Sequence, residues 1–131
     1  MSKTLNNKDI ILIDKLSYRF SEPKRFDVIS FEYAETKYLI KRIIGMPGEH
    51  IKYVDNVLYV NDVEYGDKNG LNEITDDFDI KKLGFDVIPD DMYLVIGDNR
   101  TNSLDGRSKK VGLIKKEDII GKAIVRIWPL N

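Results

Sequence analysis

The sequence predicts a mainly β protein, and two observations support this. Apolar residues come in runs of strand length, several of them rich in Val and Ile, and residues that favour turns separate these runs. A chain of 131 residues has room for a single domain with one moderate core. We therefore expect short strands, connected by tight turns, packed into one domain over residues 1–131.

The first predicted strands alternate with short connections. Residues 9–15 contain four consecutive apolar residues, which favours a buried strand over a helix. Residues 16–25 are expected to form a connecting loop, because Pro23 does not fit a central strand. Residues 27–33 alternate and predict the next strand, and residues 34–37 form a hairpin connection into the strand that follows.

A meander of three short strands is predicted next, at residues 50–53, 57–60 and 63–65. The dipeptides between these strands are Asp55-Asn56 and Asn61-Asp62. Asn and Asp tolerate positive φ, so each pair predicts a two-residue hairpin turn.

Residues 66–82 are acidic and polar, and we expect a solvated loop there. Their aspartates lack the ligand order and the closing glutamate of an EF-hand calcium loop. A turn at 89–91 leads into an apolar strand at 92–96. Near the end, residues 115–118 are expected to open a single helical turn, and residues 119–128 alternate as the closing strand.

Composition argues against several classes of function. Lys and Arg number 21 against 22 Asp and Glu, which argues against binding nucleic acid through phosphate neutralisation. No cysteine is present, so a disulfide, a thiolate metal site and a cysteine nucleophile are excluded. The single histidine, His50, is expected in an exposed turn or strand, so a Ser-His-Asp mechanism would depend on that residue alone. No apolar run approaches the ~18–20 residues that cross a bilayer, and no signal-peptide pattern is present.

Lys41 lies in an unusual position in the strand predicted at 38–44. Alternate side chains of a strand share a face, so Lys41 shares its face with Leu39 and Ile43. Such a lysine either lies at a sheet edge with its amine in water, which is the commoner case, or is desolvated. Desolvation lowers the pKa of a lysine, and a lysine that is neutral near pH 7 can act as a general base.

Two stretches together resemble a known enzyme family. Residues 41–49 read KRIIGMPGE, and residues 97–107 read GDNRTNSLDGR. In order, spacing and composition they resemble the two boxes of type I signal peptidases, the membrane-bound serine proteases that remove secretory signal peptides. Gly106 departs from the pattern, because the family usually has serine there. Smaller matches extend the resemblance from about Lys3 to Pro129.

The resemblance implies a fold and a mechanism. The fold has antiparallel sheets of the signal-peptidase and LexA-like type, with its core at about residues 1–49 and 86–131 and a small inserted β lobe at about 50–85. The mechanism is hydrolysis by a Ser-Lys dyad, in which Lys41 is the general base and Ser103 orients its amine. Neither a cofactor nor a metal is expected. The loop residues expected to hold the site together are Asp98, Asn99, Arg100, Asp105 and Arg107, the last two as an ion pair.

The implied substrate is the signal peptide of a preprotein, with small residues flanking the cut. It is expected to bind by β-augmentation along the strand that leads to Lys41. The implied substrate-binding residues are Met1, Leu5, Tyr38, Leu39 and Ile40, of which all but Tyr38 have an ordinary core position as the alternative. The resemblance also implies an N-terminal membrane anchor outside this chain and a catalytic domain on the extracytoplasmic face of the cell membrane.

The nucleophile falls at the start of the chain. Aligning Thr4-Leu5 with the family's nucleophile box puts the catalytic serine immediately before Met1, outside this chain, and Lys3 at a position usually held by proline. Ser2 is the alternative nucleophile, but it requires a slip of two residues. We therefore expect the 131 residues alone to have little or no activity.

Two other functions stay open. One is a homologue that has lost hydrolysis and acts as an assembly or binding factor in surface-protein or pilus export. The presence of both Lys41 and Ser103 argues against it. The other is a self-cleaving repressor-type Ser-Lys protease, which would need a cleavage segment and usually a DNA-binding domain, neither of which is visible.

Overall fold

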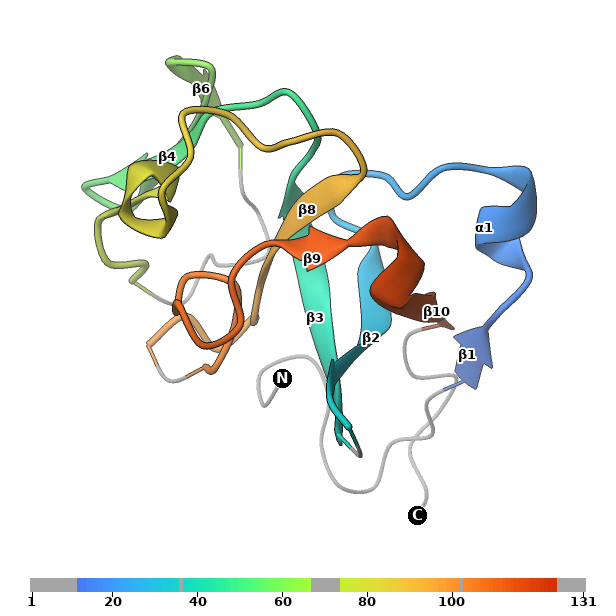
Figure 1. Ribbon diagram of the computed structural model, residues 1–131. Coiled ribbons are helices and arrows are strands. Elements are labelled where there is room, and N and C mark those ends of the chain that lie inside the picture. Colours follow the sequence, from blue (N-terminus) through green and yellow to red (C-terminus); the bar gives the residue numbers. More distant parts are fainter. Residues whose placement is uncertain (1–11, 36, 67–73, 102, 125–131) are drawn as a thin grey trace.

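The computed structural model describes residues 12–35, 37–66, 74–101 and 103–124. These residues form two antiparallel sheets, which confirms the mainly β prediction (Figure 1). In the large sheet the strand order is β1-β10-β2-β3-β8-β9, and in the small sheet it is β6-β5-β4-β7. The strands of the large sheet are β1 (Leu12–Asp14), β2 (Val28–Ala34), β3 (Lys37–Gly45), β8 (Met92–Ile96), β9 (Ile114–Lys115) and β10 (Ile119–Ile124). Those of the small sheet are β4 (Ile51–Val54), β5 (Val57–Val60), β6 (Val63–Tyr65) and β7 (Phe78–Asp79).

In the described part of the chain, three short helical segments connect the strands, namely α1 (Ser17–Phe20) and the 3-10 helices η2 (Ile80–Leu83) and η3 (Lys116–Asp118). The last of these confirms the helical turn predicted at 115–118. Among the residues described, no helix has the length and apolar character needed to cross a membrane. The predicted strands at 9–15 and 119–128 correspond to β1 and β10, and their outer ends lie outside the described residues.

β3 occupies the centre of the large sheet and carries Lys41. It pairs with β2 from Lys37 to Arg42, with Lys41 opposite Ile29. Its pairing with β8 begins only at Arg42, opposite Ile96. Within the described chain, the edge of β3 from Lys37 to Lys41 on the β8 side therefore has no strand partner. Lys41 lies where this unpaired edge ends.

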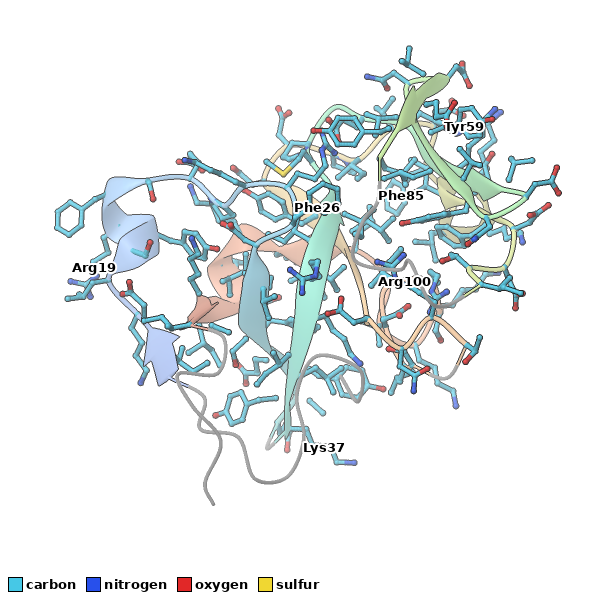
Figure 2. The ribbon with its side chains drawn as sticks, turned by 180° about the vertical axis from the view of Figure 1, so that it is seen from behind. Arg19, Phe26, Lys37, Tyr59, Phe85 and Arg100 are labelled. Atoms are coloured by element: carbon cyan, nitrogen blue, oxygen red, sulfur yellow. The ribbon has the colours of Figure 1, made fainter. Side chains whose placement is uncertain are left out.

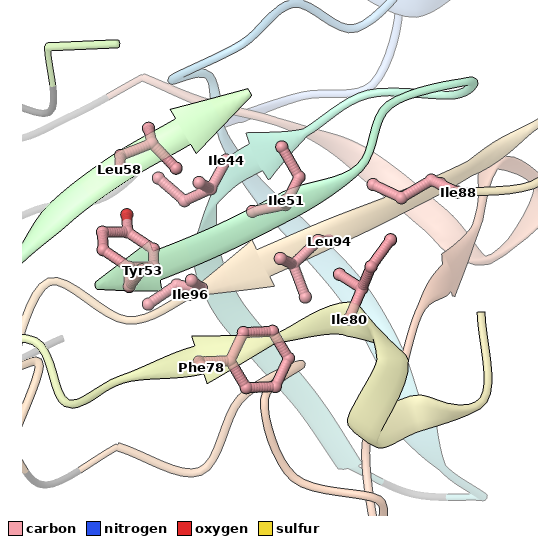
Figure 3. Packing of buried hydrophobic residues seen from close by; sticks show 9 residues of the cluster. All are labelled: Ile44, Ile51, Tyr53, Leu58, Phe78, Ile80, Ile88, Leu94 and Ile96. Carbon is pink, nitrogen blue, oxygen red and sulfur yellow. The ribbon is translucent and has the colours of Figure 1, made fainter. Parts of the chain in front are cut away.

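The two faces of β3 contribute to different cores, as the predicted alternation requires. Ile43, with Leu39 packed nearby, belongs to a cluster between β2, β3 and β8. Ile44 belongs to a second cluster that also includes Ile51 and Leu58 of the small sheet (Figure 3). Because the second cluster contains residues of both sheets, its burial stabilises their association.

The small sheet confirms the predicted meander and its turns. φ is 50° at Asp55 and 66° at Asn56, and 52° at Asn61 and 66° at Asp62. Positive φ at both central residues is the geometry of the two-residue turn whose twist matches a hairpin. β4 to β7 all lie between residues 51 and 79. The division of the whole chain into a core and an inserted lobe stays a prediction.

Two expected loops were wrong in part. The predicted loop at 16–25 contains α1, because the Asp14 carboxylate accepts bonds from the Leu16 and Ser17 amides at 2.9 and 3.0 Å. The predicted solvated loop at 66–82 contains β7 and η2, and residues 67–73 lie outside the described residues. Phe78 and Ile80 are only 6% and 0% exposed, because β7 pairs with β4 and thereby brings both into the second cluster.

His50 is also less exposed than expected. Its side chain is 17% exposed, with Nε2 lying 3.2 Å from the Asp79 carboxylate. Nδ1 lies 2.6 Å from the Asp86 carbonyl. Both ring nitrogens therefore contact acceptors at the border of the small sheet, and neither contact is with Lys41.

Candidate active site

Of the two environments considered for Lys41, the structure shows the buried one. The side chain is 7% exposed, and its Nζ donates a 2.9 Å hydrogen bond to Oγ of Ser103. Burial lowers the pKa of Lys41, and the nearby Arg107 guanidinium lowers it further, whereas the Asp105 and Asp98 carboxylates oppose this shift. Desolvation is the largest of these effects, so the neutral amine is favoured relative to a free lysine.

The loop that carries Ser103 is closed by bonds among its own residues. The Gly97 amide donates to the Asp105 carboxylate at 2.8 Å. Arg107 donates from Nε and Nη2 to the same carboxylate at 3.0 and 2.9 Å, so the predicted ion pair is present. Arg107 Nη1 also donates to the Arg100 carbonyl at 3.1 Å. Asp105 is buried, so these charge-assisted bonds satisfy a carboxylate that would be costly to leave unpaired.

Asp98 fastens the same loop to β3. Its carboxylate accepts two bonds from Arg42, at 2.9 Å from Nε and 2.8 Å from Nη2. Arg42 also donates to the Phe26 carbonyl at 2.9 Å. A planar guanidinium fits a carboxylate in this two-bond geometry better than an ammonium does. Arg42 was not among the predicted site residues, although its alternation with Lys41 places it on the opposite face of the strand.

Gly97 must be glycine for Ser103 to reach Lys41. A Cβ on residue 97 would lie 2.0 Å from Oγ of Ser103 and 3.3 Å from Nζ of Lys41. No side chain can occupy that space while the serine keeps its position. A glycine directly after an apolar strand signals such close approach, and this signal was available in the sequence.

Arg100 links the loop to the small sheet. Its Nη1 donates to the Tyr53 hydroxyl at 3.1 Å and to the Thr75 hydroxyl at 3.4 Å, and its Nε donates to the Gly97 carbonyl at 2.9 Å. Figure 2 shows Arg100 on the side of β3 that faces the small sheet. Neither Tyr53 nor Thr75 was among the predicted site residues.

Of the other predicted site residues, some lie in the described part of the chain and some lie outside it. Asn99 lies in the loop and accepts a 3.3 Å bond from the Thr101 hydroxyl. Tyr38 is exposed, while Leu39 and Ile40 are partly buried, and all three lie on the unpaired edge of β3. Met1, Ser2 and Leu5, by contrast, lie outside the described residues.

A cavity of about 310 Å³ adjoins Ser103, with Phe78, Asp77 and Arg107 among its lining residues. A larger one of about 740 Å³ lies between α1 and η3 and shares no lining residue with it. The larger cavity does not adjoin Ser103, so cavity size does not identify the site. The site is identified by the buried amine of Lys41 and its hydroxyl partner.

A mainly β fold with a buried lysine bonded to a serine hydroxyl resembles the sites of serine proteases that use lysine in place of histidine. Comparison with known proteins gives the family. Residues 1–128 match the family described as signal peptidase, peptidase S26, and the chain belongs to this family.

Its relatives match most or all of this chain. Signal peptidase I V of Bacillus subtilis is 37% identical over 130 residues, which cover 92% of this chain and 76% of that protein. A signal peptidase I of Bacillus caldolyticus is 34% identical over 140 residues, covering 100% of this chain and 76% of that protein. A crystal structure of a signal peptidase I from Enterococcus faecalis matches with a TM-score of 0.70 and 34% identity, over 78% of this chain and 97% of that one.

Proposed function

We propose that this chain is the catalytic part of a signal peptidase I, in which Lys41 is the general base that activates a serine nucleophile. The observation that carries the proposal is the 2.9 Å hydrogen bond between Nζ of Lys41, which is 7% exposed, and Oγ of Ser103. The identity of the base follows from chemistry as well, because the single histidine, His50, has its contacts at the border of the small sheet.

The chemistry requires a neutral amine. A serine hydroxyl is a weak nucleophile until a base accepts its proton. With its pKa lowered by burial, Lys41 supplies that base nearer to neutral pH than a free lysine would. One N–H of Lys41 is donated to Ser103. In the proposed mechanism this bond orients the amine so that its lone pair faces the nucleophile. As the serine Oγ attacks the scissile carbonyl, Nζ takes its proton, and the ammonium then returns a proton to the leaving amine.

The nucleophile in this proposal is a serine at the position that the alignment places immediately before Met1, outside the 131 residues. Ser2 is the alternative within the 131 residues. The assignment rests on the match of Thr4-Leu5 to the family's nucleophile box.

The substrate strand is proposed to pair with the edge of β3 from Lys37 to Lys41. That edge has no described partner on the β8 side and ends at the base, as an added substrate strand requires. Leu39 and Ile40, with Met1 and Leu5, would line the pocket for a small residue, and Tyr38 would contact the peptide further from the cut. The enzyme would act on the extracytoplasmic face of the membrane, through an anchor that precedes this chain.

The test compares the 131-residue chain with one extended by its native upstream segment, including the serine before Met1. The extended protein should cleave a preprotein at its signal-peptide junction, and the chain alone should not. Lys41→Arg in the extended protein should abolish cleavage, because a guanidinium stays protonated. Ser2→Ala in the same protein is the control and should cleave normally.

Other outcomes would redirect the assignment. If the chain alone cleaves and Ser2→Ala abolishes this, Ser2 is the nucleophile. If the extended protein folds and binds signal peptides without cleaving them, the chain is an assembly or binding factor. Full activity of Lys41→Arg would exclude Lys41 as the base.

A further inference from the structure

The side chains of Asp98 and Arg100 attach the loop that holds Ser103 to the rest of the molecule. One attachment is the Arg42–Asp98 pair, which ties the loop to the same strand that carries Lys41. The other runs from Arg100 to the Tyr53 hydroxyl in β4, at 3.1 Å, and to the Thr75 hydroxyl in the segment before β7, at 3.4 Å. The second attachment therefore crosses from the large sheet to the small one.

The second attachment consists of polar groups that are buried. Arg100 and Thr75 are each 2% exposed, and Tyr53 is 1% exposed. The Arg100 guanidinium also lies over the Tyr53 ring, 5.8 Å from its centroid. A buried charge needs acceptors of defined position, so the two hydroxyls restrict where the guanidinium can lie.

From Arg100 the restraint passes to the base in three contacts. Arg100 Nε holds the Gly97 carbonyl at 2.9 Å, and Gly97 packs against Ser103 so closely that it has no room for a Cβ. Ser103 in turn accepts the hydrogen bond from Lys41 at 2.9 Å. A shift of Arg100 toward or away from the small sheet would therefore move the acceptor of the lysine amine.

We infer that Tyr53 and Thr75, two residues of the small sheet region that do not touch the reacting groups, are positioning residues for Lys41 and act through Arg100 and Ser103. The inference rests on the proposed role of Lys41. It gives the small sheet a function in catalysis, because its hydroxyls fix the geometry of a base carried by the other sheet. Thr75 is itself fixed by a 2.8 Å bond from its amide to the Asn56 side chain, in the β4–β5 turn.

The experiment removes the two hydroxyls while keeping side-chain volume nearly constant. Tyr53→Phe and Thr75→Val are made singly and together in the extended, serine-containing protein. Tyr59→Phe is the matched control, because Tyr59 lies on β5 away from Arg100 (Figure 2) and packs near Lys52. kcat and KM are measured across pH, and the Lys41 amine is titrated by nitrogen-15 NMR.

The double variant is expected to lose kcat by about tenfold to 100-fold at unchanged KM, as small misplacements of catalytic groups do. Its Lys41 pKa should rise toward that of a free lysine, because a loosened loop admits water to the amine. The acid limb of the rate profile should move with it, and Tyr59→Phe should show neither change.

A lowered unfolding midpoint with unchanged kcat and unchanged Lys41 titration would overturn the inference, since it would make the network structural only. The titration reads positioning directly and does not require turnover. If Lys41→Arg proves active but the double variant still shifts the Lys41 pKa, the proposed mechanism fails while the positioning contact stands.

Discussion

Gly97→Ala should lower the rate of cleavage strongly while leaving the protein folded. The added Cβ would lie 2.0 Å from Oγ and 2.8 Å from Cβ of Ser103, whereas ordinary van der Waals contact begins at 3.4 Å. Ser103 must therefore retreat by about 1.4 Å, the difference between 3.4 and 2.0 Å, which breaks its 2.9 Å bond to Lys41. Displacement of about 1 Å can cost about 100-fold in rate. We expect a loss of kcat on that order, with overpacking costing about 1–3 kcal/mol in stability.

The assay is preprotein cleavage by the extended protein, with urea unfolding measured in parallel. Gly66→Ala is the control, because a Cβ there meets nothing within 4 Å. If the change acts through Ser103, Gly97→Ala combined with Ser103→Ala should be little slower than Ser103→Ala alone. Normal cleavage by Gly97→Ala, or losses that simply multiply in the double variant, would refute this reasoning.

Three other predictions concern stability. Gly106→Ser introduces the residue usual in the family. It should nevertheless destabilise this chain by about 1–3 kcal/mol, because its Cβ would lie 2.7 Å from the Val95 carbonyl oxygen. An unchanged midpoint of urea unfolding would contradict this prediction. Arg42→Lys should lower the unfolding temperature, because an ammonium cannot make both bonds to the buried Asp98. An unchanged unfolding temperature would show that the two-bond geometry does not contribute to stability. Lys41→Met should stabilise the fold at pH values below the lowered pKa of Lys41, because the buried ammonium is costly there. This gain in stability should shrink as the pH rises toward the ordinary lysine pKa of 10.5. Urea unfolding that shows no gain, or a gain independent of pH, would contradict the prediction.

Local sequence signals predicted the parts of the fold that depend on local geometry. The turns at Asp55-Asn56 and Asn61-Asp62 need positive φ at two adjacent residues, and residue type alone indicates this. The alternation around Lys41 likewise placed Leu39 and Ile43 on one face. The contact between Lys41 and Ser103 was expected from the family resemblance, since no local signal joins residues so far apart.

The other features of the fold and the site depend on contacts between residues far apart in the sequence. Phe78 and Ile80 lie among acidic residues, and only the pairing of β7 with β4 explains their burial. Arg42 and Asp98 are 56 residues apart, and Tyr53 and Arg100 are 47 apart. Periodicity within one strand cannot indicate which distant group will satisfy a buried charge, so these partners could not be predicted.

The central claim is that Lys41 is held in an environment that favours the neutral amine. The most direct measurement is a nitrogen-15 NMR titration of the Lys41 Nζ in the folded, serine-containing protein, with the exposed Lys109 as an internal reference. We predict that Lys41 titrates below the 10.5 of an ordinary lysine, and that the acid limb of the cleavage rate follows the same titration. A Lys41 amine that titrates at or above 10.5 while cleavage proceeds near neutral pH would contradict the claim.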